Sequence, residues 1–165
     1  MDKFYGMNNN HIFKIDNAHI TYRNFAGEAR QYNNAGNRNF NLILRPEDAE
    51  MFQMEGFRVR ERPPREEGGD PLYLMAVNVS FKFRPPRVVV IRGRNKIELT
   101  EETISELDYA DIESIDMTIR PYRWTMPDGR TGVKAYLNSM YVTLVTDPYE
   151  DKYFGEEEED EENPF

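Results

Sequence analysis

The stretch IESIDMTIRPYRWTMPDGRTGVKAYLNSMYVTLV, residues 112–145, contains two alternating segments joined by a turn rich in Pro, Asp and Gly. Apolar side chains recur at every second position on both sides of the turn, which is the period of a half-buried β-strand. The stretch therefore predicts a long β-hairpin. Which side chains share a face depends on how its two strands are paired.

The length of the turn decides this pairing. A two-residue loop at Asp128–Gly129 would pair Trp124 with Val133 and would set aromatic rings among core residues. A loop one or three residues longer pairs 124 with 132, 122 with 134 and 120 with 136, with Gly129 as a left-handed turn residue. We prefer this second register, because it keeps four side chains on the core side: Met117, Ile119, Leu137 and Ser139.

The preferred register collects aromatic and basic side chains on the other face of the hairpin. They are Arg120, Tyr122, Trp124, Lys134 and Tyr136. Bases stack on aromatic rings at about 1–3 kcal/mol each, and cations follow the phosphates of a single strand. The face is therefore typical of a surface for single-stranded nucleic acid. Half-buried aromatic strand formers beside a solvated face are the alternative interpretation.

Outward from the hairpin, strand-like segments alternate with polar loops. The strand-like segments are 11–25, 38–44, 57–62, 72–83 and 87–93, and the loops are 27–37 and 63–71. Short helices are expected from Pro46 to Gly56 and from Thr100 to Leu107, each with acidic residues in its first turn. In 72–83 the odd positions, including Phe81 and Phe83, are expected to face the core.

This order of elements predicts the fold class. Two strands, an interrupted third strand, a short helix and two final strands are the order of a five-stranded Greek-key barrel of the oligonucleotide-binding (OB) type. We therefore predict a mainly β OB-fold domain over residues 11–146, with short helices and an insertion at about 46–62. Residues 1–10 are expected to be flexible. We find no membrane span and no signal peptide, so a cytoplasmic protein is expected.

The net charge of −9 is concentrated at the end of the chain. Residues 147–165 contain ten acidic residues and one Lys, whereas residues 1–146 contain twenty acidic and twenty basic residues. A neutral domain can place its bases on one face, so the acidic composition does not exclude nucleic acid as a ligand. We predict that 147–165 is a disordered acidic tail, which could aid solubility, compete with nucleic acid for the basic face, or dock to a partner through Pro164 and Phe165.

Body and tail together resemble the single-stranded-DNA-binding proteins of bacteria and phages. The similar parts are the OB-type order, the hairpin, the segments NAHITYRNFAG, YNNAGNRNF and RPPRVVVI, and the acidic end EEEEDEENPF. The resemblance implies sequence-tolerant binding of single strands in replication, recombination and repair, in the cytoplasm of a bacterial host if the chain is phage-encoded. It also implies no catalysis, and recruitment of replication and recombination proteins by the tip Asn163–Pro164–Phe165.

The chain departs from this family pattern in three places. Asn163 stands where the family usually carries an apolar residue, the insertion at 46–62 is unlike the bacterial members, and their long linker is absent. A homo-oligomer is therefore possible but its size is not implied, and a monomer or dimer fits at least as well as a tetramer.

Residues and resemblance together predict a binding face with the five hairpin residues at its centre. Its expected periphery is Arg23, Phe25, Arg38, Lys82 and Arg84. Other bases and aromatics lie nearby in the sequence, among them Tyr22, Tyr32, Arg58, Arg60 and Arg62. No catalytic residue, metal or cofactor is expected.

Parts of the sequence also fit two other classes of protein. One is an inhibitor or DNA mimic whose acidic tail occupies the basic channel of a host enzyme, although mimicry favours acids spread over a folded surface rather than a terminal string. The other is a Mg²⁺-dependent nuclease built on a run of carboxylates. That run is Asp108, Asp111, Glu113 and Asp116.

Overall fold

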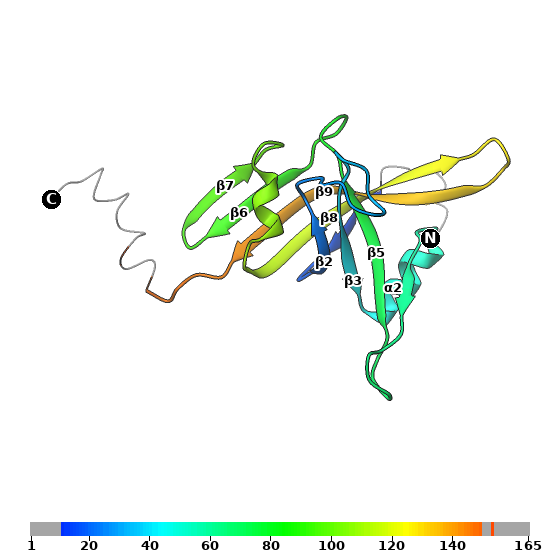
Figure 1. Ribbon diagram of the computed structural model, residues 1–165, viewed down its shortest axis with the longest axis horizontal. Coiled ribbons are helices and arrows are strands. Elements are labelled where there is room, and N and C mark those ends of the chain that lie inside the picture. The colour runs from blue at the N-terminus through cyan, green and yellow to red at the C-terminus, as the bar shows by residue number, and fades with distance from the viewer. Residues whose placement is uncertain (1–10, 150–152, 154–165) are drawn as a thin grey trace.

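The computed structural model describes residues 11–149 and Tyr153. The predictions of a flexible segment 1–10 and of a disordered acidic tail therefore fall largely outside the described residues. Within them the chain is mainly β, as predicted, with nine strands in one sheet, an α-helix and a 3-10 helix (Figure 1). The elements are β1 (Phe13–Ile15), β2 (His19–Asn24), β3 (Arg38–Leu44), α2 (Pro46–Met54), β4 (Arg60–Arg62), β5 (Leu72–Val79), β6 (Arg87–Arg92), β7 (Asn95–Leu99), η1 (Ile104–Asp108), β8 (Ile112–Thr125) and β9 (Thr131–Leu144).

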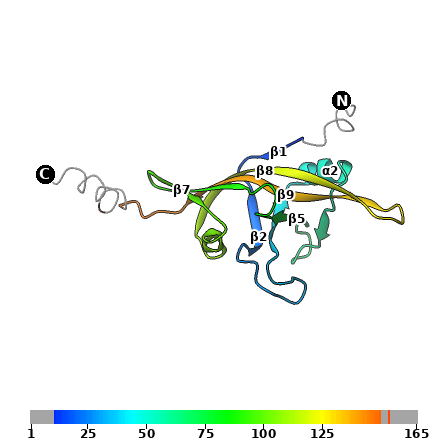
Figure 2. The same cartoon turned by 90° about the horizontal axis from the view of Figure 1, so that it is seen from above.

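The hairpin β8–β9 forms the long axis of the molecule, and its tip extends beyond the rest of the sheet (Figures 1 and 2). The predicted register is confirmed, because Trp124 pairs with Gly132 and the pairs 122–134 and 120–136 follow. The turn is closed by a hydrogen bond of 2.8 Å from the Met126 N–H to the Arg130 carbonyl. Gly129 takes the left-handed conformation expected of it, with φ of +94°.

A β-bulge in the same hairpin corrects one prediction. The pairing shifts by one residue between Thr118 and Ile119, which leaves Asn138 without a partner in the ladder. Asn138 Nδ2 donates to Thr118 Oγ1 at 3.0 Å, and the Thr118 and Ser139 hydroxyls lie 2.6 Å apart. Ser139 therefore joins this polar group and Met140 faces the core, so the prediction of an inward Ser139 is wrong.

The strand β9 lies in the centre of the sheet. It runs antiparallel to β8 and parallel to both β5 and β6. The β5 contact is at Asn78–Tyr136 and the β6 contact begins at Arg87–Ser139, so the connection 80–86 carries the chain from one parallel partner to the next. On the far side of β5 the sheet continues through β3 to β2, and β1 pairs with β8 at the other edge.

The core is built from the alternation that the sequence shows. Phe40, Leu42 and Leu44 of β3 are buried, as predicted, and they lie opposite Met75 and Val77 of β5. Each fully buried side chain of this size adds about 1.5–3 kcal/mol to folding. The inward side chains thus fix which face of β3 and β5 remains polar.

The helix α2 lies where the sequence predicts it. Pro46 opens it, and Gly56 ends it with φ of +101°, a conformation that glycine adopts without strain. Its buried side chains are Ala49 and Phe52. The Phe52 ring lies 5.3 Å from the Phe13 ring and 5.3 Å from the Phe57 ring, so an aromatic cluster attaches the helix to the sheet.

Two strand predictions are wrong in extent. Residues 11–25 do not form one strand, because the chain turns at Asn17, where φ is +51°, and β1 and β2 then pair with different strands. The strand expected over 72–83 ends at Val79. Phe83 is therefore 92% exposed instead of facing the core.

Two further elements differ from the prediction. Residues 95–99 form a strand, β7, that pairs with β6 and was not predicted. The helix expected from Thr100 is a 3-10 helix that begins at Ile104 and buries Ile104 and Leu107. None of the described helices is long and apolar enough to cross a membrane.

Candidate nucleic-acid interface

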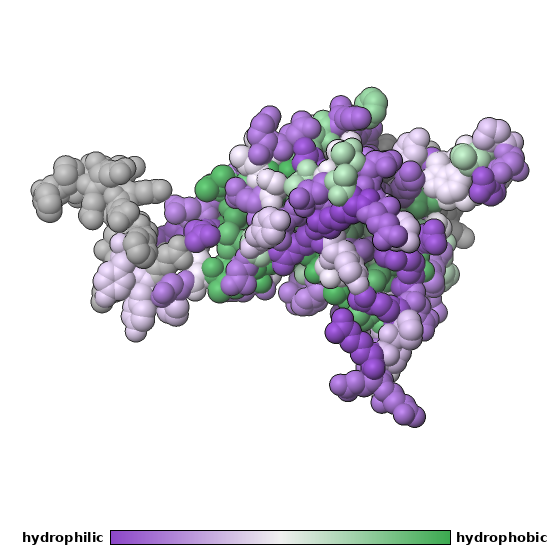
Figure 3. Space-filling model, viewed as in Figure 1, coloured by the Kyte–Doolittle hydropathy of each residue, from purple (hydrophilic) through white to green (hydrophobic). Residues whose placement is uncertain are grey.

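Strand pairing arranges polar side chains into two rows on the side of the sheet opposite the core. The first row, from β8 to β3, is Arg120, Tyr136, Asn78 and Asn39. The second row consists of Tyr122 and Lys134 of the hairpin and, on the neighbouring strands, Ala76, Asn41 and Thr21; the adjacent pair Val77–Ala135 aligns its two parts, and Ala76 is its one apolar member. Because side chains of paired residues point to the same face, the hairpin residues and the asparagines of β3 and β5 form one surface. The molecule is mostly hydrophilic over β2, β3 and β5, whereas hydrophobic atoms gather near β6 and β7 (Figure 3).

The hairpin end of this surface presents aromatic rings. Tyr122 is 53% exposed, and its ring meets the Tyr136 ring edge to face, with 6.0 Å between centroids. The Arg120 guanidinium lies over the Tyr136 ring at 5.4 Å from its centroid. Trp124 lies against the backbone of Gly132, where an added Cβ would collide with the indole. All five predicted hairpin residues therefore lie together.

Arg120 carries an unbalanced positive charge. Burial lowers the pKa of its guanidinium, the neighbouring charge of Arg84 lowers it further, and Tyr136 acts in the opposite direction. Its Nε is buried and has no hydrogen-bond partner among the described residues. Arginine stays protonated at neutral pH even so. Two like charges with an unused donor are the arrangement that a phosphate group would stabilise.

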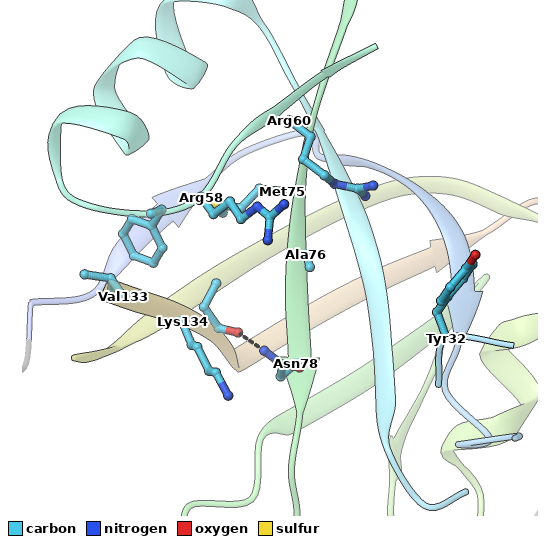
Figure 4. A pocket seen from close by; sticks show the side chains of 10 residues that line it. Tyr32, Arg58, Arg60, Met75, Ala76, Asn78, Val133 and Lys134 are labelled. Atoms are coloured by element: carbon cyan, nitrogen blue, oxygen red, sulfur yellow. Dashed lines mark hydrogen bonds between the residues drawn. The ribbon is translucent and has the colours of Figure 1, made fainter. Parts of the chain in front are cut away.

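A groove of about 600 Å³ lies beside the two rows (Figure 4). Its lining is Tyr32, Phe57, Arg58, Arg60, Met75, Ala76, Asn78, Val133, Lys134 and Ala135. Arg60 donates to Asn41 Oδ1 at 3.1 Å, and Asn78 Nδ2 donates to the Ala135 carbonyl at 3.2 Å across the parallel strands. The groove therefore adds two arginines and the exposed ring of Tyr32 to the hairpin surface.

A second aromatic–basic pair lies on β2 and β4. Arg62 lies over the Tyr22 ring at 5.3 Å from its centroid and donates to the Tyr22 hydroxyl. Tyr22 has φ of +52°, which a side chain other than glycine adopts at a cost of about 1–3 kcal/mol. The strand irregularity at this point directs Tyr22 to the surface.

Three predicted peripheral residues have packing contacts instead. Arg23 Nη1 donates to the carbonyls of Leu107 at 3.0 Å and Ala110 at 2.8 Å. Phe25 is 0% exposed and stacks on Phe40, so the expectation that its ring lies at the surface is wrong. Arg38 donates to the Phe25 carbonyl at 2.8 Å. These side chains hold the loops behind the face.

The other predicted site residues are divided between described and undescribed parts. Lys82 and Arg84 are exposed in the connection 80–86, and Arg84 lies close enough to Arg120 to act on its charge. The predicted tip of the tail lies outside the described residues; it consists of Asn163, Pro164 and Phe165.

Two of the four carboxylates of the alternative nuclease site have structural partners. Asp108 accepts from the backbone N–H groups of Phe25 at 2.6 Å and Ala26 at 3.0 Å, and Asp116 accepts from Asn17 at 3.0 Å. Within residues 11–149 and Tyr153, no three His, Cys, Asp or Glu side chains form a group that could hold a metal ion.

Sequence reasoning missed several residues of the face. Asn39, Asn41 and Asn78 carry no motif, and only the pairing of β3, β5 and β9 brings them beside Tyr136. Arg58 and Arg60 were visible as bases, and their alternation with Val59 was a signal that both point away from the core. Position in the sheet, rather than residue type, identifies these side chains.

Comparisons with known proteins identify related sequences and folds. The sequence matches a family described as a putative phage ssDNA-binding domain over residues 6–163. The comparison with curated proteins finds no match. The chain is similar to the single-stranded DNA-binding protein from bacteriophage Enc34 as a C-terminal truncation, with 15% identity, a TM-score of 0.53, and coverage of 83% of this chain and 87% of that chain.

A second Enc34 structure, in complex with ssDNA, is similar with 13% identity, a TM-score of 0.54, and coverage of 84% of this chain and 89% of that chain. At such identities the likeness shows a shared fold, which confirms the predicted mainly β, OB-type class.

Proposed function

The chain belongs to the family of putative phage ssDNA-binding domains, and we propose that it binds single-stranded DNA, without sequence preference and without catalysis, through the polar face of its sheet. The observation that carries this proposal is the run of paired residues from Arg120 across Tyr136 and Asn78 to Asn39. The complex of the fold-related Enc34 protein with ssDNA supports it.

Base stacking on aromatic rings and the attraction between phosphates and basic side chains provide the binding free energy. Unpaired bases stack on the rings of Tyr122, Trp124 and Tyr136, and the phosphates lie against Arg120, Lys134 and the arginines of the groove. Every base has a flat face, so stacking selects for unpaired strands rather than for sequence. The bases of a duplex already stack on one another, and their faces cannot reach these rings. A preference for single strands over duplex follows.

The sole tryptophan of the chain, Trp124, provides the direct test. Titration with oligo-dT at low salt should quench its fluorescence, and the affinity should fall as salt rises because bound phosphates release counterions. A duplex of the same length is the control and should bind more weakly. Equal binding of duplex, or no salt-dependent binding of oligo-dT, would contradict the proposal.

We further propose the biological setting that the resemblance implies. The protein protects single strands during replication and recombination in the cytoplasm of a bacterial host, and its tip Asn163–Pro164–Phe165 recruits partner proteins. The bases of the face and the acids of the tail lie in different parts of the chain, which supports this division between DNA binding and partner binding. Removal of Glu156–Phe165 should abolish capture of replication proteins and leave oligo-dT binding in place. Loss of both activities together would contradict the division.

A further inference from the structure

Phe83 is a large apolar side chain that the fold leaves in solvent. It is 92% exposed, although the sequence alternation predicts a core position. The strand β5 ends at Val79, and Pro85 and Pro86 follow a bend at 81–84, so the ladder is not continued. Exposure of a single apolar residue is common and by itself indicates no function.

The connection 80–86 is held at both ends. Phe81 is half-buried against the core, and the Arg38 guanidinium lies 5.7 Å from its ring centroid. Pro86 is buried at the other end. Four consecutive exposed residues lie between these anchors: Lys82, Phe83, Arg84 and Pro85. The fold thus presents an aromatic ring between two cations on a short, fixed loop.

This loop lies beside the polar face. Its two flanking strands pair with β9 at Tyr136 and at Ser139, so the loop runs along the stretch of β9 that follows the first row. The charge of Arg84 acts on Arg120, whose buried Nε has no hydrogen-bond partner among the described residues. A phosphate bound near these two guanidinium groups would offset their repulsion.

We propose that Phe83 stacks on a base of single-stranded DNA and that Arg84 and Arg120 together hold the phosphate beside that base. This inference rests on the proposed function. It extends the path of the strand from the rings of the hairpin past Tyr136 to the connection 80–86. The path thus has aromatic contacts on both sides of the Arg120 charge.

Binding of oligo-dT by Phe83→Ala, measured by fluorescence anisotropy of a labelled strand, tests the proposal. We expect the Kd to rise by about 5- to 150-fold, which is the range for one lost base–aromatic stack. Tyr109→Ala is the matched control, because Tyr109 is an 85% exposed ring beside Arg92 and Val145, away from the rows. Its Kd should equal that of the wild type.

Two further variants separate stacking from charge. In Phe83→Trp combined with Trp124→Phe, the indole at position 83 should be quenched by oligo-dT. Arg84→Gln should lower the slope of log Kd against log salt by about 0.7, the value for one phosphate contact to a single strand.

The outcomes distinguish this inference from the proposed function. Wild-type affinity in Phe83→Ala, together with quenching of Trp124 in the wild type, would overturn the role of Phe83 and leave the proposed function standing. Absence of any oligo-dT binding by the wild type would overturn both.

Discussion

At the scale of residues, Arg120 is the side chain whose environment most favours an anion. The charge of Arg84 acts on it, its guanidinium lies over the Tyr136 ring, and its buried Nε has no hydrogen-bond partner among the residues that the structure describes. A phosphate that accepts from it gains a charge-assisted hydrogen bond worth about 1.5–3 kcal/mol. The side chain therefore combines the two components of single-strand binding, an aromatic contact and a phosphate contact.

Arg120→Gln should weaken oligo-dT binding by about 10- to 150-fold and should lower the salt slope by about 0.7. Arg123→Gln removes the same charge from the neighbouring residue of β8, which points to the opposite face, and should change the Kd little. Filter binding over a series of salt concentrations measures both quantities. Equal effects of the two substitutions would show that only net charge matters.

Gly132 leaves the space that the Trp124 indole occupies. A methyl group at position 132 would collide with the indole, so Gly132→Ala should force the ring outward, at a cost of about 0.5–1.5 kcal/mol if the rotamer becomes strained. The emission of Trp124 should shift to longer wavelength, and its quenching by oligo-dT should change. Thr131→Ala, one residue away and exposed, is the control and should leave the spectrum unchanged.

The contents of the hairpin face could be predicted from the sequence, because they depend only on alternation and on the length of one turn. The functions of Arg23, Phe25 and Arg38 could not be predicted, because their partners are carbonyls and rings brought together by folding. The local sequence does not distinguish an arginine that is exposed in the fold from one that is buried. Phe83 was mispredicted because the alternation of the sequence continues beyond Val79, where the strand β5 ends and the chain bends.

At the scale of elements, Phe52 is the larger of the two buried side chains that attach α2 to the sheet. Phe52 joins Phe13 and Phe57 in the aromatic cluster, whereas Met54 on the same helix is 82% exposed. The helix was predictable from Pro46, its acidic first turn and Gly56, all of which are local signals. Its packing partner on β1 was not predictable, because it lies more than thirty residues earlier in the chain.

Phe52→Ala should lower the free energy of unfolding by about 3–5 kcal/mol, through lost burial and the cavity left behind. Met54→Ala should change it by less than about 0.5 kcal/mol, as is usual for an exposed position. Urea denaturation of the two variants and the wild type provides the comparison. A similar loss of stability in both would mean that the helix is held by other contacts.

The bulge at Asn138 and the strand β7 are two features that alternation in the sequence does not predict. A bulge inserts one residue without changing the composition of a strand, and here it is stabilised by Thr118 and Ser139 from two different strands. The strand β7 is mostly exposed, with only Leu99 buried, so it lacks the alternation that identifies a half-buried strand.

At the scale of the whole molecule, charge is divided between a neutral body and an acidic end. Deletion of Glu156–Phe165 should leave the Kd for oligo-dT equal or lower it at low salt, because an acidic segment of the same chain competes with phosphates for basic side chains. The difference should disappear as salt rises, since screening weakens the attraction. Electrophoretic mobility with poly-dT measures the effect, and a loss of affinity on deletion would contradict it.

The central position of β9 has a consequence for how the protein is made. Its three partners, β5, β6 and β8, all precede it in the chain, and two of them pair with it in parallel over long sequence separations. Non-local parallel pairing is slow, because the loops must close before the contacts form. During synthesis the strand edges that pair with β9 therefore stay unpaired until Thr131–Leu144 has left the ribosome. Chaperones can bind the exposed edges in this interval.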